Sequence, residues 1–184
     1  MTSANLHDVE SMLAKYPIFQ YGFLDSNEIK FSDRVRYICE TECERYNTSW
    51  SCPPAVGSIE SCRLKCREYN SVLLFSTLAE VDDPKYIEES LQTGKEHEAI
   101  VAGVRHEMER LKEECLVLSS RSCDVCSTCT WPDAPCRYPK QMLPCIESYG
   151  ILVVDAAKKC GMDFFCDMNT IIWFGLIFFH RIRQ

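Results

Sequence analysis

The chain has few of the residues on which several common functions depend. Its 7 glycines are scattered and nowhere form a Gly-x-Gly pair, so no loop that would cradle the phosphates of a nucleotide or flavin is indicated. Basic residues are outnumbered, with 20 Lys and Arg against 27 Asp and Glu, and the net charge of −7 argues against a nucleic-acid partner. The most apolar stretch, residues 171–179, is too short to cross a bilayer, so we expect no membrane partner.

Two further absences bear on the compartment of the protein and on the kind of metal site it can have. The amino-terminal residues MTSANLHDVE lack the apolar segment of a secretory signal, so we expect a cytoplasmic protein. None of the 4 histidines stands at zinc-finger spacing from a cysteine, so a mixed Cys/His zinc site is unsupported. Against these absences stand 13 cysteines. An odd number of thiols in a reducing compartment fits a disulfide framework poorly, which leaves metal binding or redox chemistry.

The apolar pattern predicts an α/β (or α+β) fold, with a small mixed sheet flanked by helices in a single metal-binding domain of residues 1–184. We expect a hairpin over residues 18–31, a helix over 58–69 capped by Ser58 and a strand at 72–75. A long helix over 84–118, a helix over 151–160 ended by Gly161 and a strand at 171–179 follow. Residues 35–54 and 119–144 are rich in cysteine and proline. They predict two irregular loops at one side of the sheet.

The second of these loops carries the sharper metal-binding signal. Cys123, Cys126 and Cys129 follow one another at gaps of two residues, and Cys136 comes six residues later. This spacing begins like the cluster-binding run of bacterial ferredoxins, although the gap before the fourth cysteine is longer here. Zinc is the alternative, but it is usually held by two separated Cys-x2-Cys pairs. We therefore expect these four cysteines to hold an iron–sulfur cluster.

The first loop presents Cys39, Cys43 and Cys52. The first two stand one helical turn apart, and the third is followed by two prolines that keep its backbone extended. Three thiolates would leave one coordination position open unless Cys62 or Cys66 folds back to fill it. The remaining cysteines show no ligand spacing and are interpreted as packing residues: Cys115, Cys145, Cys160 and Cys166.

Taken together, these motifs resemble those of a known family, the predicted metal-binding proteins called domain of unknown function 2284. The first half of the resemblance is Cys39-x3-Cys43 and the segment from Tyr46 to Trp50-Ser51-Cys52-Pro53-Pro54. The second half is Cys123-x2-Cys126-x2-Cys129-x6-Cys136-Arg137-x-Pro139, continued by Glu147-Ser148-Tyr149-Gly150-Ile151. One departure is Cys145, where the family pattern more usually has serine, so this position is either an added ligand or a neutral exchange. The resemblance implies metal binding in a prokaryotic, often anaerobic, setting, and it supplies no reaction.

These observations predict an iron–sulfur protein with two cysteine-ligated centres and one or two 4Fe-4S clusters. Its expected role is electron transfer or the reductive activation of a redox partner protein. One alternative is an enzyme that acts on a small-molecule substrate, such as one containing sulfur, at an open iron of the first centre. Another is a binding module stabilised by zinc.

Overall fold

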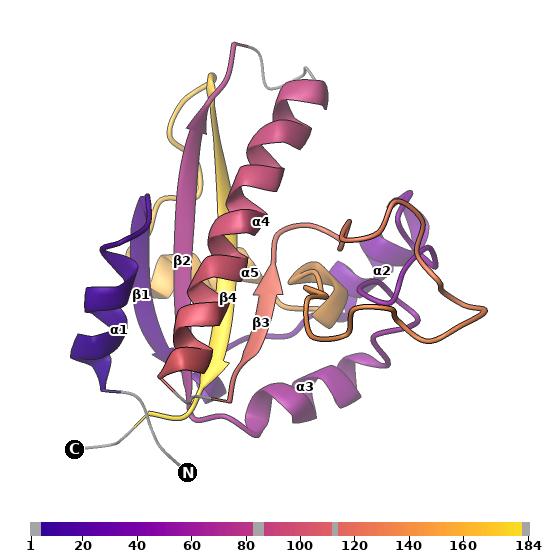
Figure 1. Cartoon of the computed structure of the whole chain (residues 1–184), viewed down its shortest axis with the longest axis horizontal. Coiled ribbons are helices and arrows are strands. Elements are labelled where there is room, and N and C mark those ends of the chain that lie inside the picture. Colours follow the sequence, from indigo (N-terminus) through magenta and orange to yellow (C-terminus); the bar gives the residue numbers. More distant parts are fainter. Residues whose placement is uncertain (1–4, 83–86, 112–113, 182–184) are drawn as a thin grey trace.

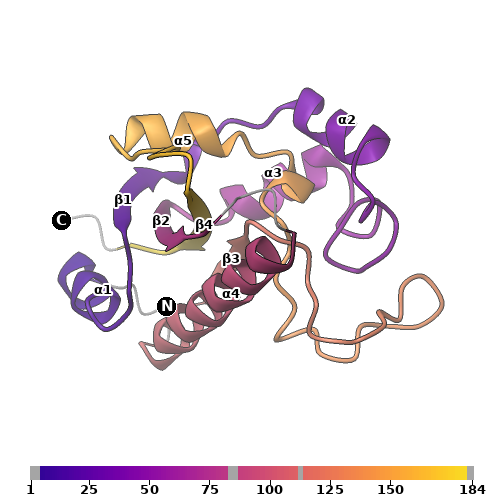
Figure 2. The same cartoon turned by 90° about the horizontal axis from the view of Figure 1, so that it is seen from above.

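The computed structural model describes residues 5–82, 87–111 and 114–181. Within these ranges the protein is an α/β fold, in which helices cover both faces of a four-stranded sheet (Figures 1 and 2). The strand order is β1-β2-β4-β3. The strands are β1 (Gln20–Asp25), β2 (Ser71–Glu80), β3 (Leu116–Ser119) and β4 (Thr170–Phe179). The helices are α1 (Leu6–Leu13), α2 (Asp33–Thr41), α3 (Ile59–Arg67), α4 (Ile87–Arg110) and α5 (Val153–Lys159), with 3-10 turns η1 (Ser26–Glu28) and η2 (Glu147–Tyr149).

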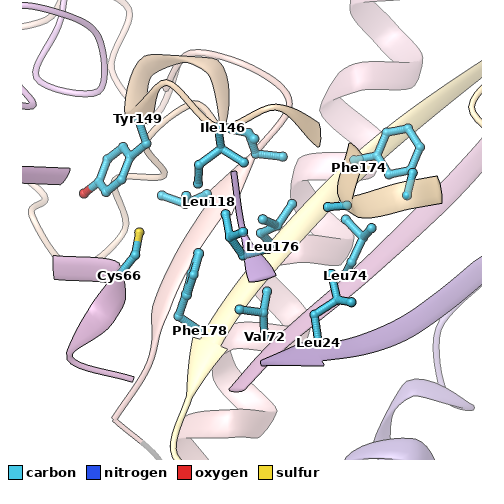
Figure 3. Packing of buried hydrophobic residues seen from close by; sticks show 14 of the residues in the cluster. Leu24, Cys66, Val72, Leu74, Leu118, Ile146, Tyr149, Phe174, Leu176 and Phe178 are labelled. Carbon is cyan, nitrogen blue, oxygen red and sulfur yellow. The ribbon is translucent and has the colours of Figure 1, made fainter. Parts of the chain in front are cut away.

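The two central strands carry apolar side chains on both faces, because each face is covered by helices. In β2 the side chains alternate, as strand geometry requires: Leu73 and Phe75 enter one core, and Val72 and Leu74 enter the other. The core of Leu73 is closed by α1 and α4. The core of Val72 is closed by α3, α5 and the η2 turn. Cys66 on α3, Tyr149 in η2 and Ile146 just before η2 pack against the sheet (Figure 3). Burial on both faces explains the continuous apolar sequence of β2 and β4.

His97 on α4 is buried against this sheet and serves the fold. Its Nε2 lies 3.0 Å from the Phe174 carbonyl oxygen and its Nδ1 lies 2.8 Å from the Thr77 hydroxyl. The carbonyl can only accept, so the neutral ring donates through Nε2 and accepts through Nδ1. Burial lowers the pKa of His97 to about 4, although the bond to Phe174 opposes that shift.

Most of the expected elements are present. The helix capped by Ser58 is α3, whose cap hydroxyl accepts the Ser61 amide at 3.1 Å. The strands expected at 72–75 and 171–179 are β2 and β4, and α5 ends before Gly161, which has a φ of 65°. In the described part of the chain, no helix is both long enough and apolar enough to cross a membrane.

Four details of the sequence-based fold are wrong. The sheet is antiparallel at all three strand pairs rather than mixed. No hairpin forms over residues 18–31, because β1 pairs with β2 and is followed by the η1 turn. The first loop is not irregular throughout, since residues 35–41 belong to α2. The long helix ends at Arg110, and its expected last turn is strand β3; the proposed start at Pro84 lies outside the described residues.

The last of these errors has a clear physical cause. Val117 and Leu118 are both buried, but they enter different cores on opposite faces of the sheet. Such a pair of adjacent apolar residues continues a helical stripe and also suits a strand buried on both sides. Tertiary packing decides between the two structures, and here β3 pairs with β4.

Both cysteine-rich segments lie at the same side of the sheet, as expected (Figure 1). In Figure 1, α2 and the long connection from β3 to η2 project together on one side of the sheet, and Figure 2 shows the same grouping from above. The η2 turn returns the chain to α2, where the two elements pack together. This return brings residues near 145 beside the first cysteine segment.

Candidate metal centres

A cavity of about 420 Å³ gathers cysteines from three separate parts of the chain. Cys39 comes from α2, Cys43 and Cys52 come from the turns after it, and Cys145 comes from the approach to η2. We call these four residues the first centre. The other residues that line this cavity come from the same segments and from the end of β3: Val35, Ile38, Arg45, Tyr46, Pro53, Ser120, Ser122, Glu147 and Ser148.

The fourth cysteine of this cavity is the one that spacing did not single out. The Cys145 thiol donates a hydrogen bond of 2.8 Å to Glu147. Burial raises the pKa of Cys145 well above its usual range, and the neighbouring Glu147 carboxylate raises it further. Burial also raises the pKa of Glu147, while the bond from Cys145 lowers it. The thiol is therefore protonated in the metal-free protein and must lose its proton to bind a metal.

Arg36 connects α2 to the segments that close this cavity. Its side chain is 7% exposed, and its guanidinium donates to the Gly57 carbonyl at 2.9 Å and to the Ser148 carbonyl at 2.5 Å. These bonds orient α2 against η2, which places Cys39 one helical turn from Arg36 on the side of Cys145. Burial, together with Cys43 and Glu147, raises the pKa of Cys39 to about 11, and Arg36 partly opposes the shift.

The second centre is the group Cys123, Cys126, Cys129 and Cys136, which line one small hollow of about 20 Å³. The loop that carries them has no helix or strand, as expected, and it is held by its own polar groups. The Thr130 hydroxyl donates to the Pro135 carbonyl at 2.9 Å, and the Arg137 guanidinium donates to the Thr128 carbonyl at 2.8 Å. Arg137 therefore joins two parts of the loop through its hydrogen bond to Thr128.

Two tryptophans join the cysteine loops. The Trp50 and Trp131 rings meet edge to face with their centroids 4.7 Å apart. Trp50 donates its indole N–H to the Ala134 carbonyl at 3.1 Å, and Trp131 donates to the Asn47 side chain at 2.8 Å. Each loop thus supplies an aromatic ring that is hydrogen-bonded to the other loop, which keeps the two centres adjacent.

The cavities differ in how well they suit a metal. Within residues 5–82, 87–111 and 114–181, no group of three or more His, Cys, Asp or Glu side chains converges on a point where a single ion would sit. The first-centre thiols instead surround a space much larger than one ion. Their donor set of four thiols, with no histidine, suits soft metals and iron–sulfur clusters. In the second centre the cysteine spacing suits a cluster, but the hollow of about 20 Å³ is too small to hold one in this conformation.

A third cavity, of about 510 Å³, lies between α4 and the second cysteine loop, and Cys123 forms part of its wall. Side chains of both charges line it, including Lys95, Lys140, Glu98 and Asp124. Burial and the nearby Asp124 raise the pKa of Glu98 to about 7. Because the charges are mixed, the lining does not select a class of ligand.

The structure brings together the cysteines that the sequence singled out as ligands, and it separates Cys62 and Cys66 from them. Each expected set lines its own cavity: Cys39, Cys43 and Cys52 in the first, and the four cysteines of the second loop in the second. Cys62 and Cys66, which the sequence left open as fourth ligands, are fully buried in the core under α3. The departure from the family pattern at Cys145 was the one sequence signal that pointed to this position.

Comparison with known proteins agrees with the character of these sites. No curated protein sequence and no solved structure matches the chain. One family, described as predicted metal-binding protein (DUF2284), matches residues 22–179, a range that contains all eight cysteines of the two centres. The chain therefore belongs to this family of predicted metal-binding proteins.

Proposed function

We propose that the protein is an iron–sulfur protein that passes electrons to a redox partner protein. The observation that carries the proposal is the meeting of Cys39, Cys43 and Cys52 with the distant Cys145 around one cavity of about 420 Å³. Four unpaired thiols gathered in one place, of which only Cys52 is buried, would be an oxidation liability without a metal to bind them.

The arrangement of the first centre favours a cluster over a single zinc ion. Zinc requires four ligands directed at one point, with sulfur about 2.3 Å from the metal. In a cluster of several irons, each thiolate bonds to a different iron, so the thiolates stand around a volume and need not converge. A bound cluster would supply reversible one-electron chemistry. The chain would contribute the ligands, a hydrogen bond from its own backbone or hydroxyls to the sulfurs, and partial exclusion of water.

The second centre is supported by its spacing more than by its cavity. Cys123, Cys126 and Cys129 match the start of a ferredoxin run, and Cys136 lies on the wall of the same hollow. A hollow of about 20 Å³ must widen to hold a cluster, and the loop around it contains no regular secondary structure to oppose that change. A single zinc ion is the alternative for this centre.

A second candidate function is catalysis on a small molecule at the first centre. The cavity includes the non-ligand side chains of Ile38, Tyr46 and Glu147, and its volume lies in the range of small-molecule sites, which is roughly 300–1,000 Å³. An apolar wall with the partly buried Glu147 carboxyl would hold and orient a small substrate. In that case one of the four cysteines would not be a ligand.

Anaerobic purification with analysis of iron, acid-labile sulfide and zinc tests the proposal. We expect iron and sulfide in near-equal amounts, and we expect the double variant Cys126→Ser/Cys129→Ser to keep the first cluster only. A protein saturated with zinc that refuses iron on reconstitution would exclude the proposed function. A shift of the electron paramagnetic resonance signal on adding cyanide or a small thiol would favour the catalytic alternative.

A further inference from the structure

Ser51 is a buried hydroxyl that touches ligands of both candidate centres. Its side chain is fully buried. The Cys123 amide donates to Ser51 Oγ at 2.9 Å, and the Cys145 amide donates to the Ser51 carbonyl at 3.4 Å. Ser51 also precedes Cys52 in the chain, and its Oγ lies 3.8 Å from the Cys52 sulfur. One residue is therefore bonded to one cysteine of the second centre and to two of the first.

We propose that Ser51 is a positioning residue shared by both centres, so that metal bound at either one increases the affinity of the other. This inference rests on the proposed assignment of two metal centres, but it does not depend on whether the metal is iron or zinc. The coupling is reciprocal by thermodynamic necessity: each centre must change the affinity of the other by the same factor.

The direction of the hydrogen bonds explains how one centre acts on the other. A metal-bound Cys52 is a thiolate, which can only accept a hydrogen bond, so Ser51 Oγ–H donates to it. Ser51 then accepts from the Ser49 hydroxyl, 2.9 Å away, and from the Cys123 amide. Metal at the first centre thus fixes the hydroxyl in the orientation that receives Cys123. Metal at the second centre fixes Cys123 and, through it, the same hydroxyl.

The segments joined at Ser51 have little other regular structure to order them. The second cysteine loop has no helix or strand between β3 and η2, and residues 42–58 form only turns and bends. Ordering such segments costs conformational entropy. A metal that binds at one centre orders both segments in part, so the metal at the other centre loses less entropy on binding. The Ser51 hydroxyl contacts Cys123 of the second centre and Cys52 of the first. It therefore links a ligand of one centre directly to a ligand of the other.

Zinc binding to the metal-free protein measures the coupling without relying on redox chemistry. First-centre affinity is compared, under reducing anaerobic conditions and against a chromophoric chelator, in the wild type and in Cys126→Ser/Cys129→Ser. We expect the wild-type first centre to bind zinc on the order of tenfold more tightly when the second centre is filled, within the usual range of about 5- to 150-fold. The same comparison in a Ser51→Ala background should show a clearly smaller difference, because only the tryptophan contacts then join the two loops.

Ser76→Ala is the matched control, because Ser76 is also a fully buried serine with a hydrogen-bonded hydroxyl. It lies on β2 and donates to the Gln20 carbonyl, away from both centres. The coupling should persist in this variant. Equal affinities in the presence and absence of the second centre, or a coupling that Ser51→Ala leaves undiminished, would overturn the inference. So would a chain that binds zinc at neither centre. If the purified protein holds zinc instead of iron but the coupling is present, the iron–sulfur proposal fails and this inference stands.

Amide hydrogen exchange provides a test that leaves Ser51 unchanged. In Cys126→Ser/Cys129→Ser, zinc can fill the first centre alone, and the Cys123 amide still faces Ser51 Oγ. We expect zinc to slow the exchange of this amide by roughly tenfold, as for strengthening one hydrogen bond. An exchange rate for Cys123 that is unaffected by zinc contradicts the inference, even if Ser51→Ala fails to fold.

Discussion

Replacing Cys145 by serine and by alanine separates the two roles that this thiol has in the structure. It lines the first-centre cavity, and it donates a hydrogen bond of 2.8 Å to Glu147. Serine retains a donor, so we expect Cys145→Ser to change the free energy of unfolding of the metal-free protein by less than about 1 kcal/mol. Alanine leaves the partly buried Glu147 carboxyl without this partner, which should cost about 1–3 kcal/mol. Urea unfolding of the reduced, metal-free variants measures both values.

Both variants lack a thiolate at position 145, so metal binding should respond differently from stability. We expect each to lose the first cluster and keep the second. With two four-iron clusters, the iron content falls from about eight to about four atoms per chain. Iron and labile-sulfide analysis, with electron paramagnetic resonance of the reduced protein, measures this loss.

Cys62→Ser is the control, since Cys62 is fully buried and does not line the cavity. It should retain both clusters, with only a stability cost from placing a hydroxyl in the core. The reasoning is refuted if Cys145→Ser keeps its full iron content while Cys62→Ser loses the first centre. That result would restore Cys62 as the fourth ligand.

Three further predictions concern the scaffold. Stability should fall as pH drops from 6.5 toward 4, because the lowered pKa of His97, about 4, lets the unfolded chain take up a proton first. Over this range the free energy of unfolding should fall by about 3 kcal/mol. In His97→Gln the free energy of unfolding should depend less steeply on pH. Gly175→Ala should lower the Tm by an amount equivalent to about 1–3 kcal/mol, since a Cβ would lie 2.5 Å from the Phe75 ring; an unchanged Tm contradicts this packing. Arg36→Lys should cost about 1–3 kcal/mol in urea unfolding, because the Ser148 carbonyl loses the guanidinium that bonds it, and a neutral result would mean that lysine replaces this bond.

The sequence was sufficient for those elements whose signals are local. The Ser58 cap, the positive φ of Gly161 and the apolar runs of β2 and β4 each depend on a few neighbouring residues, and each is present in the structure. The second centre belongs to the same class, since all four of its cysteines lie within one short loop. Spacing alone therefore determined which residues share that hollow.

Pairings between distant segments were decided only by the tertiary structure. β1 pairs with β2, which follows two helices later in the chain, and not within a hairpin over residues 18–31. The end of the long helical pattern is strand β3, because its adjacent apolar residues are buried on opposite faces of the sheet. Such choices depend on long-range burial, which periodicity within one segment does not contain.

The first centre shows the same division within a single site. Sequence spacing selected Cys39, Cys43 and Cys52, which lie within one segment, but it placed Cys145 among the packing residues. The structure brings Cys145 to their cavity because the chain returns through β3 and the second cysteine loop to the η2 turn, which packs on α2. The types of residue that bind metal were therefore determined by the sequence. The set that shares the first cavity was determined by packing, because only the folded chain places residues about a hundred positions apart around one space.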